Sequence, residues 1–400
     1  MTFDVCIINQ NNENLEKTLQ SLDANKEYIS QIIVSGKSED KGIQSLNIDS
    51  KNEADHRNAC LEAAKSEYIL WLSPDIELED ETLEEYADIL DEIESDVDII
   101  YPNEVFFDEE DEKIRNYEDW YGKEELLLQS LSLENHLPNW AVLTKKSTLE
   151  KFGGFESQYN DYTFYAFIYK NLKNLSLKLS DLSFINHYIH ESFIDTSYRS
   201  KLVRDIVEKY TLQEIFPKLN WENENLALAT AYTLIGDVLA KYYNYFNASS
   251  FYRNAMLSFH NQETLRKLID AYLQMGLFDE AKQLLTTQDA TQEMQEELLQ
   301  KIEQTQKLVQ NIEKSVEEGK SGEILAMAND IMSYYEGAPI YNVLGVIYTL
   351  KGDLENAYKF FYKAATMNPI DKDILANLAE IAKKIHREND VIALYERMTK

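Results

Sequence analysis

Polar residues that can bind a ligand stand directly after the predicted strands in the first half of the chain. In a mostly parallel sheet the carboxyl ends of the strands form one edge, where ligands bind. Amide, hydroxyl and carboxylate oxygens at that edge can accept hydrogen bonds, and carboxylates can coordinate hard cations such as Mg²⁺. The residues in this position are Asn9, Ser35, Ser73 and Asp75.

No competing catalytic pattern is present in the sequence. Gly-x-Ser-x-Gly, a Walker loop and His-Glu-x-x-His are all missing, and only His187 and His190 of the six histidines are closely spaced. The two cysteines, Cys6 and Cys60, cannot form a disulfide framework or a zinc site. We expect both to be buried thiols of a protein in a reducing compartment.

The elements that must position these residues follow an α/β pattern from residue 1 to about 200. Segments with helical spacing separate the apolar runs, and Asp55 and Asp80 are the expected N-caps of two of these helices. This order predicts a mostly parallel sheet with helices on both faces. The predicted strands are residues 4–8, 31–34, 68–72 and 97–101.

The second half has helical spacing throughout and repeats with a period near 34 residues. Its clearest unit, Ala338–Asp371, has the small and aromatic residues of a tetratricopeptide repeat, with Gly345 small enough for two helices to approach closely. Weaker units precede and follow it, and residues 286–320 are expected to be divergent helices with a possible linker. Stacked repeats would present a concave face to a peptide or protein. The residues at repeat positions are Tyr341, Leu344, Gly345, Tyr348, Gly352, Ala357, Phe361, Ala364 and Pro369.

The composition excludes several classes of partner. With 39 Lys and Arg against 71 Asp and Glu, the net charge of −32 argues against a nucleic-acid backbone and an anionic membrane surface. No apolar stretch is long enough to predict a membrane span. The opening Met1-Thr2-Phe3-Asp4 lacks the features of a signal peptide. We therefore expect a cytoplasmic protein.

Five segments of the first half, in this order, resemble motifs of the family 2 glycosyltransferases, which have the GT-A fold. The last of them, HYIHESF, is similar to the His-Glu segment of glycosyltransferases fused to tetratricopeptide repeats, such as sublancin-type peptide S-glycosyltransferases and flagellin glycosyltransferases. The resemblance therefore covers essentially the whole chain. The segments are Ile7–Leu22, Ile32–Asp40, Asp55–Asp75, Phe152–Tyr162 and His187–Phe193.

This resemblance implies a role for each matching position. Asp75 and His190 would hold Mg²⁺ or Mn²⁺ against the diphosphate of a nucleotide-sugar, for which a UDP-sugar is the favoured donor. Asp161 would take the proton from an acceptor hydroxyl or thiol in an inverting transfer. The positions implied to bind the nucleotide-sugar are Asn9, Asn11, Ser35, Ser38, Asp40, Arg57, Asn58 and Ser73.

The sequence departs from the family pattern at several of these positions. Ser73 replaces the first acid of the metal motif, Ser35 and Gly36 replace the two acids that bind the nucleobase, and Asn11 replaces an aromatic residue. Plain structural roles also stay open. Asp75 would then be a capping or surface acid, Asp161 a loop aspartate and His190 an ordinary hydrogen-bonded histidine.

The resemblance implies an α/β GT-A (Rossmann-like) domain at residues 1–200, a connecting helix at 201–222 and an all-α tetratricopeptide-repeat solenoid at 223–400. The favoured function is sugar transfer to a protein or peptide, such as flagellin, another surface protein or a secreted peptide, with the repeats positioning this acceptor. One alternative is a catalytically degenerate fold that acts as an interaction scaffold. Another is transfer to a polysaccharide or cell-envelope sugar. Self-association through the repeats is also left open.

Overall fold

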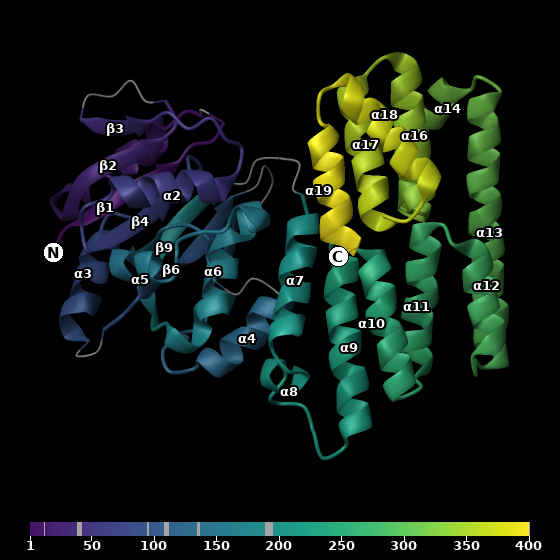
Figure 1. Ribbon diagram of the computed structural model, residues 1–400, viewed down its shortest axis with the longest axis horizontal. Helices are drawn as coiled ribbons and strands as arrows, with labels where there is room; N and C mark the ends of the chain where they lie inside the picture. Colours follow the sequence, from purple (N-terminus) through teal and green to yellow (C-terminus); the bar gives the residue numbers. More distant parts are fainter. Residues whose placement is uncertain are drawn as a thin grey trace. The chain divides into compact units, whose positions relative to one another are not determined.

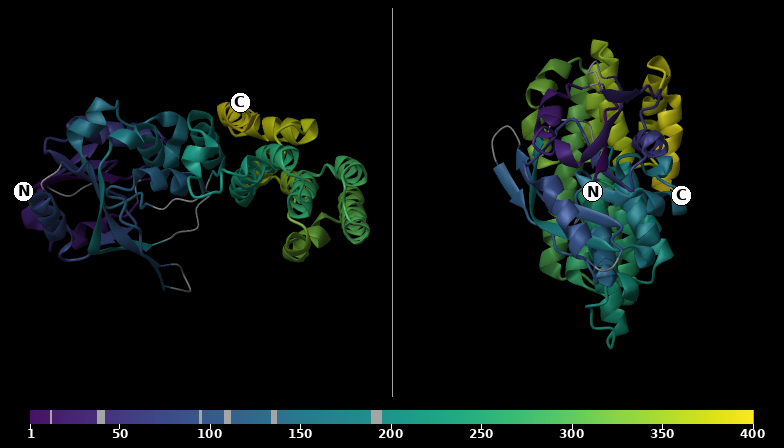
Figure 2. Two further views of the ribbon diagram at one scale, coloured as in Figure 1. Left: turned by 90° about the horizontal axis from the view of Figure 1, so that it is seen from below. Right: turned by 90° about the vertical axis from the view of Figure 1, so that its left-hand side faces the viewer.

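The structure is a computed structural model that describes residues 1–11, 13–37, 42–93, 96–107, 112–133, 137–188 and 195–399. Contacts divide the chain into two units, Met1–Tyr198 with Asp205–Pro217 and Arg199–Arg204 with Lys218–Lys400. The first unit is α/β, and the described part of the second is helical (Figure 1, Figure 2). This confirms the predicted fold class.

One mixed sheet forms the centre of the first unit. Its order is β3-β2-β1-β4-β8-β6-β9-β5, and β7 pairs with β6. Because β2 and β4 both lie parallel to β1, and β3 parallel to β2, one half has the 3-2-1-4 order of a Rossmann-like sheet. The strands are β1 (Phe3–Ile8), β2 (Ile29–Ser35), β3 (Ile43–Leu46), β4 (Tyr68–Leu72), β5 (Ile76–Leu78), β6 (Ile99–Phe107), β7 (Glu112–Arg115), β8 (Val142–Lys145) and β9 (Leu177–Tyr188).

The other half of the sheet is less parallel than the sequence predicts. β6 is parallel to β9, but the pairs β4–β8, β6–β8, β6–β7 and β5–β9 are antiparallel. Trp71 near the end of β4 pairs with Val142 at the start of β8. The residues that precede β8 therefore lie at the same edge of the sheet as the residues that follow β4.

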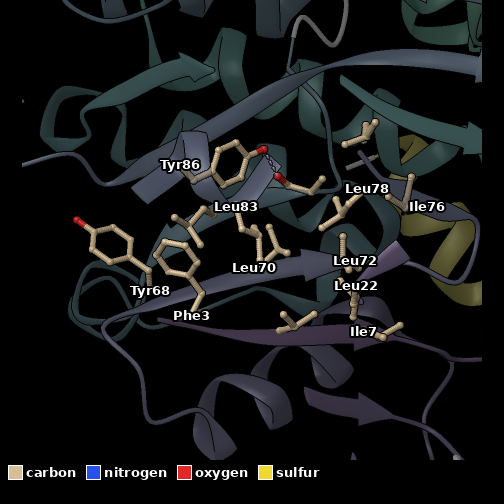
Figure 3. Close-up of a cluster of buried hydrophobic side chains, with 14 of the residues drawn as sticks. Phe3, Ile7, Leu22, Tyr68, Leu70, Leu72, Ile76, Leu78, Leu83 and Tyr86 are labelled. Carbon is tan, nitrogen blue, oxygen red and sulfur yellow. Dashed lines mark hydrogen bonds between the residues drawn. The ribbon is translucent and has the colours of Figure 1, made fainter. Parts of the chain in front are cut away.

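Helices cover both faces of the sheet, as expected for a doubly wound fold. Val5 and Ile7 pack with side chains of β4 and of the helices α1 and α3 on one face (Figure 3). Cys6 points to the opposite face, where it lies beside Cys60 of α2, and both thiols are buried and free, as predicted. The helices of this part of the chain are α1 (Glu16–Ser21), α2 (Glu53–Ala63), α3 (Thr82–Glu92), α4 (Glu124–Leu133), α5 (Lys146–Lys151), α6 (Thr163–Asn171), α7 (Ser197–Lys209) and α8 (Leu212–Ile215), with 3₁₀ helices η1 (Lys26–Tyr28), η2 (Ser157–Tyr162) and η3 (Leu172–Asn174).

The two predicted N-caps are displaced by a few residues. Asn52 caps α2 by accepting a hydrogen bond from the backbone N–H of Ala54. Asp55, the predicted cap, instead accepts hydrogen bonds from the hydroxyls of Ser50 and Ser157. The cap of α3 is Glu81 rather than Asp80, without a side-chain hydrogen bond.

In the described part of the second unit, helices pack on their neighbours in sequence. Figure 1 shows α9, α10 and α11 side by side, and α16 packs directly on α17. Gly345 of α16 permits this approach, because a Cβ there would lie 2.6 Å from the Phe361 ring of α17. The helices are α9 (Glu224–Lys241), α10 (Tyr245–Ser258), α11 (Gln262–Met275), α12 (Phe278–Thr287), α13 (Gln292–Glu317), α14 (Ser321–Ala326), α15 (Ala328–Tyr334), α16 (Ala338–Lys351), α17 (Leu354–Met367), α18 (Lys372–Lys384) and α19 (Glu388–Thr399).

The two segments with the least detailed sequence-based prediction, residues 286–320 and 201–222, are largely helical. Most of residues 286–320 forms the single helix α13, and Leu298, Ile302 and Val309 bury one side of it in the core. The predicted connecting helix is divided between the end of α7 and the short α8. None of the described helices combines the length and the apolar character that a membrane span needs.

Candidate active site

A small cavity lies at the carboxyl ends of β1 and β4, where the strand order of the parallel half reverses. This reversal is the place where open α/β sheets bind ligands. The cavity has a volume of 150 Å³, and hollows of 760 and 800 Å³ lie elsewhere on the unit. We select the small cavity because its lining includes three residues predicted for the site, Asn11, Ser73 and Asp75, together with further carboxylates. Its lining residues are Ile8, Gln10, Asn11, Glu13, Glu53, Ser73, Pro74, Asp75 and Trp140.

Asp75 lies next to a charged histidine. Its carboxylate accepts a hydrogen bond from Ser73, and its Oδ2 lies 3.4 Å from Nε2 of His187. Burial acts to raise the pKa of Asp75, but the hydrogen bonds from His187 and Ser73 outweigh it and hold the pKa below its usual value. The register of β5 with β9 explains the contact, because it pairs Ile76 with His187.

His187 is itself held between two carboxylates. Its Nδ1 lies 3.5 Å from Oε1 of Glu104, a buried residue that also accepts a hydrogen bond from the Tyr117 hydroxyl. Burial would lower the pKa of His187, but Asp75 and Glu104 together raise it to about 9. His187 is therefore protonated at neutral pH, and it places a positive charge beside Asp75.

Asp161 lies in η2, beside the start of α2. Burial, together with the negative charges of Glu53 and Asp195, raises its pKa to about 7. The neighbouring Asn160 has a positive φ of 42°, and its Oδ1 accepts a hydrogen bond of 3.0 Å from the backbone N–H of Glu53. Glu53 also lines the cavity, so Asp161 is coupled to one of its lining residues, and its role in the site stays a prediction.

Arg57 is fully buried beside the cavity. Its Nε lies 2.6 Å from Oε1 of Glu53, and its Nη2 donates to the backbone oxygen of Asn139 at 3.2 Å. The guanidinium carbon lies 4.4 Å from the ring centre of Trp140 and 5.4 Å from that of Trp71. Arg57 therefore holds Glu53 and the backbone before Trp140 in place at the cavity wall. A direct contact between Arg57 and a nucleotide stays a prediction.

Asn58 holds the segment that leads to Asp161. Its Nδ2 donates to the backbone oxygen of Phe155 at 2.8 Å, and its Oδ1 accepts from the Phe155 N–H at 2.9 Å. Gly154, with a φ of 73°, is required here because a Cβ would lie 2.5 Å from Oδ1 of Asn58. The turn at Gly153 and Gly154 is therefore fastened to α2 by the Asn58 side chain.

Of the remaining predicted residues, Asn9 and Ser35 form hydrogen bonds with backbone groups, and Asn11 lines the cavity. Asn9 is buried and closes its loop through both backbone groups of Glu13, while the exposed Asn11 donates to the Glu13 carboxylate at 3.1 Å. The buried Ser35 hydroxyl donates to the backbone oxygen of Ile7 at 3.4 Å. Three predicted site residues lie outside the described residues: Ser38, Asp40 and His190.

Four residues of the site were not predicted. His187 is the first residue of the segment HYIHESF, but the resemblance implied a metal-binding role for His190 instead. Glu104 is a single acid within the apolar run IIYPNEVFF, which is a signal of a special role. Glu53 and Trp140 had no local signal, because only the packing of α2 and β8 brings them to the cavity.

A metal ion would have few protein ligands at this site. Among the described residues, no three His, Cys, Asp or Glu side chains are grouped closely enough to hold one. Asp75 is the carboxylate placed at the strand ends, and His187 currently occupies one of its oxygens. A cation here would therefore depend on oxygens supplied by a ligand.

Comparison with known proteins identifies the repeat. A model of the tetratricopeptide repeat matches residues 338–371, the unit predicted from the sequence, which forms α16 and α17. No curated protein sequence matches the chain.

Solved structures give a weak likeness over most of the chain. The S. aureus TarS 1–349 structure in complex with UDP-GlcNAc is 16% identical and has a TM-score of 0.44, covering 76% of this chain and 93% of that chain. The structure of TarS 1–349 alone is 16% identical and has a TM-score of 0.42, covering 76% and 92%. TM-scores this low support no conclusion about function.

Proposed function

We propose that the chain is a glycosyltransferase that moves a sugar from a nucleotide-sugar, favoured as a UDP-sugar, to a protein or peptide. One observation carries this proposal. The cavity at the strand reversal is lined by Asp75, which lies beside the charged His187, and by Glu53, whose negative charge helps to raise the pKa of Asp161. A site of this kind can hold a diphosphate and also remove a proton.

The acidic walls of the cavity favour a divalent cation together with the donor. Glu13, Glu53 and Asp75 would repel an uncompensated diphosphate. Mg²⁺ and Mn²⁺ are commonly held by one or two carboxylates plus substrate phosphates, and Asp75 meets that requirement. When bound, the cation would offset the charge of the departing diphosphate. His190 remains the proposed second ligand, and the protonated His187 adds positive charge beside Asp75.

Asp161 supplies the base. With a pKa of about 7, it is substantially ionised at neutral pH and still basic enough to take a proton. The acceptor oxygen or sulfur attacks the anomeric carbon and passes its proton to Asp161, while the bond to the nucleoside diphosphate breaks. The transfer inverts the anomeric centre. Such a base contributes about 10²–10⁴-fold to the rate.

The second unit supports a macromolecular acceptor. A tetratricopeptide repeat is present, and stacked helix pairs present more surface than a monosaccharide acceptor needs. The proposed acceptor is flagellin, another surface protein or a secreted peptide.

The same repeat also favours a second candidate, an interaction scaffold that binds a protein partner without transferring sugar. The absence of a three-ligand metal group among the described residues is compatible with this alternative. The two candidates differ in whether Asp161 has a chemical role.

The test is transfer of sugar mass to a defined set of acceptors. The chain is incubated with Mn²⁺, UDP-glucose or UDP-N-acetylglucosamine, and purified flagellin or a cysteine- and serine-containing peptide. Intact-mass spectrometry should show one hexose or N-acetylhexosamine increment with the wild type and none with Asp161→Asn. Equal products from both proteins would refute the role of Asp161. An increment found only on added polysaccharide would refute the polypeptide acceptor.

A further inference from the structure

The proposed function leaves the aromatic wall of the cavity without a role. Trp140 is the one aromatic residue among the described residues that line it, and carboxylates border the same space. A pyranose ring has C–H groups on its flat side and hydroxyls around its rim. An aromatic face next to hydrogen-bond acceptors suits that combination.

The backbone on both sides of Trp140 is fixed by side chains and strands. Arg57 donates to the backbone oxygen of Asn139, the residue before it. The N–H of Ala141, the residue after it, donates to the oxygen of Trp71 at 2.7 Å. The hydroxyl of Tyr86 donates to the Ala141 oxygen at 2.8 Å. The indole is therefore presented by a rigid support, with the Arg57 guanidinium against its ring at 4.4 Å.

The support includes backbone strain. Ala141 is fully buried and has a φ of 53°, in the left-handed region that residues with a Cβ rarely adopt. Such a conformation persists only where the surroundings impose it, and it is concentrated at functional sites. Here it turns the chain between Trp140, which lines the cavity, and β8.

The order of residues along the sheet edge indicates which part of a donor reaches Trp140. Ser35 is the last residue of β2, Asn9 follows β1 and Asp75 follows β4. Trp140 precedes β8, which is antiparallel to β4 and lies on the side away from β1. A nucleotide with its base over β1 and β2 and its diphosphate at Asp75 would extend its sugar toward Trp140.

We propose that Trp140 is the stacking surface for the sugar ring of the donor, and that Arg57 is a positioning residue that holds it. This inference rests on the proposed function, because it takes the ligand to be a nucleotide-sugar. The ligand class is a hexopyranose linked to a nucleoside diphosphate. The Glu53 carboxylate, held by the same Arg57, borders this subsite and can accept hydrogen bonds from sugar hydroxyls.

Calorimetric titration of the full chain tests the inference with a matched pair of ligands, UDP and UDP-N-acetylglucosamine, both with Mn²⁺. Trp140→Ala should weaken binding of the nucleotide-sugar about tenfold and leave UDP binding unchanged. Trp140→Phe keeps an aromatic face and should recover most of the loss, which also covers the case in which the alanine variant folds poorly. Tyr121→Ala, which removes a surface ring outside the cavity lining, is the control.

The outcomes separate this inference from the proposed function. If the wild type binds both ligands and Trp140→Ala weakens both equally, Trp140 stacks on the nucleobase and the sugar subsite is refuted. Unchanged binding of both ligands by this variant would refute any contact. If the wild type binds neither ligand, the proposed function fails and the subsite fails with it.

Discussion

Replacing Asp161 by asparagine should stabilise the protein in a way that grows with pH. In the folded protein burial and the charge of Glu53 raise the pKa of Asp161 from 3.8 to about 7. A carboxyl group with a raised pKa in the folded protein stays protonated up to a higher pH there than in the unfolded chain. Its effect on stability therefore changes between about pH 4 and pH 7, with stability falling as pH rises. Asparagine has nearly the same shape and cannot ionise, so the variant escapes this loss.

The size of the effect follows from the pKa. Each tenfold change in proton affinity corresponds to about 1.4 kcal/mol, so ionisation of Asp161 in the folded protein costs about 4 kcal/mol above pH 7. Roughly half of this, about 2 kcal/mol, develops between about pH 5.5 and pH 8.5. The free-energy difference between Asp161→Asn and the wild type should grow by that amount over this range.

Urea unfolding followed by tryptophan fluorescence measures this difference. Trp71, Trp120 and Trp140, three of the four tryptophans, lie in the first unit, so the signal reports mainly on the unit that contains Asp161. The variant should also lose sugar transfer. A stability difference that stays constant with pH, or a variant less stable than the wild type at high pH, would refute the buried, charge-coupled position of Asp161.

Three further substitutions give independent tests. Gly345→Ala should destabilise the second unit by about 1–3 kcal/mol because its Cβ would overlap the Phe361 ring; a thermal unfolding curve with an unchanged transition would contradict the packing. Asn58→Ala should lower stability by about 1–3 kcal/mol, measured by urea unfolding, because two backbone groups lose their partner; a neutral effect would argue against the fastening of the Gly-Gly turn. Glu104→Gln should lower the pKa of His187 from about 9, because a neighbouring negative charge is removed. NMR titration of the imidazole measures this pKa, and an unchanged midpoint would contradict the contact between His187 and Glu104.

The elements that could be predicted from the sequence are those whose signal is local. β1, β2 and β4 are interior strands, and each contains a short apolar run, which in β2 is confined to residues 32–34. The repeat at residues 338–371 could be recognised because close helix packing demands small residues such as Gly345 at fixed positions. The positions of Ser73 and Asp75 followed from the end of β4 in the same way.

The parts that could not be predicted depend on contacts between distant segments. β9 mixes buried and exposed positions and has a register shift opposite residues 101–103 of β6, so its sequence lacks a regular alternation. Only its pairing with β5 places His187 beside Asp75. Arg57 matched a ligand-binding motif, but aromatic rings far along the chain, including Trp140, enclose its guanidinium.

The central claim is that the cavity at the strand reversal binds a nucleotide-sugar with the help of Asp75. Thermal unfolding with a panel of nucleotides and nucleotide-sugars, each with and without Mn²⁺, tests it most directly. A ligand at about 100 times its dissociation constant raises the free energy of unfolding by about 2.7 kcal/mol, which should raise the melting temperature by several degrees. We expect a shift for one nucleobase that requires Mn²⁺ and is lost in Asp75→Asn. No shift with any ligand would contradict the account and favour the interaction scaffold.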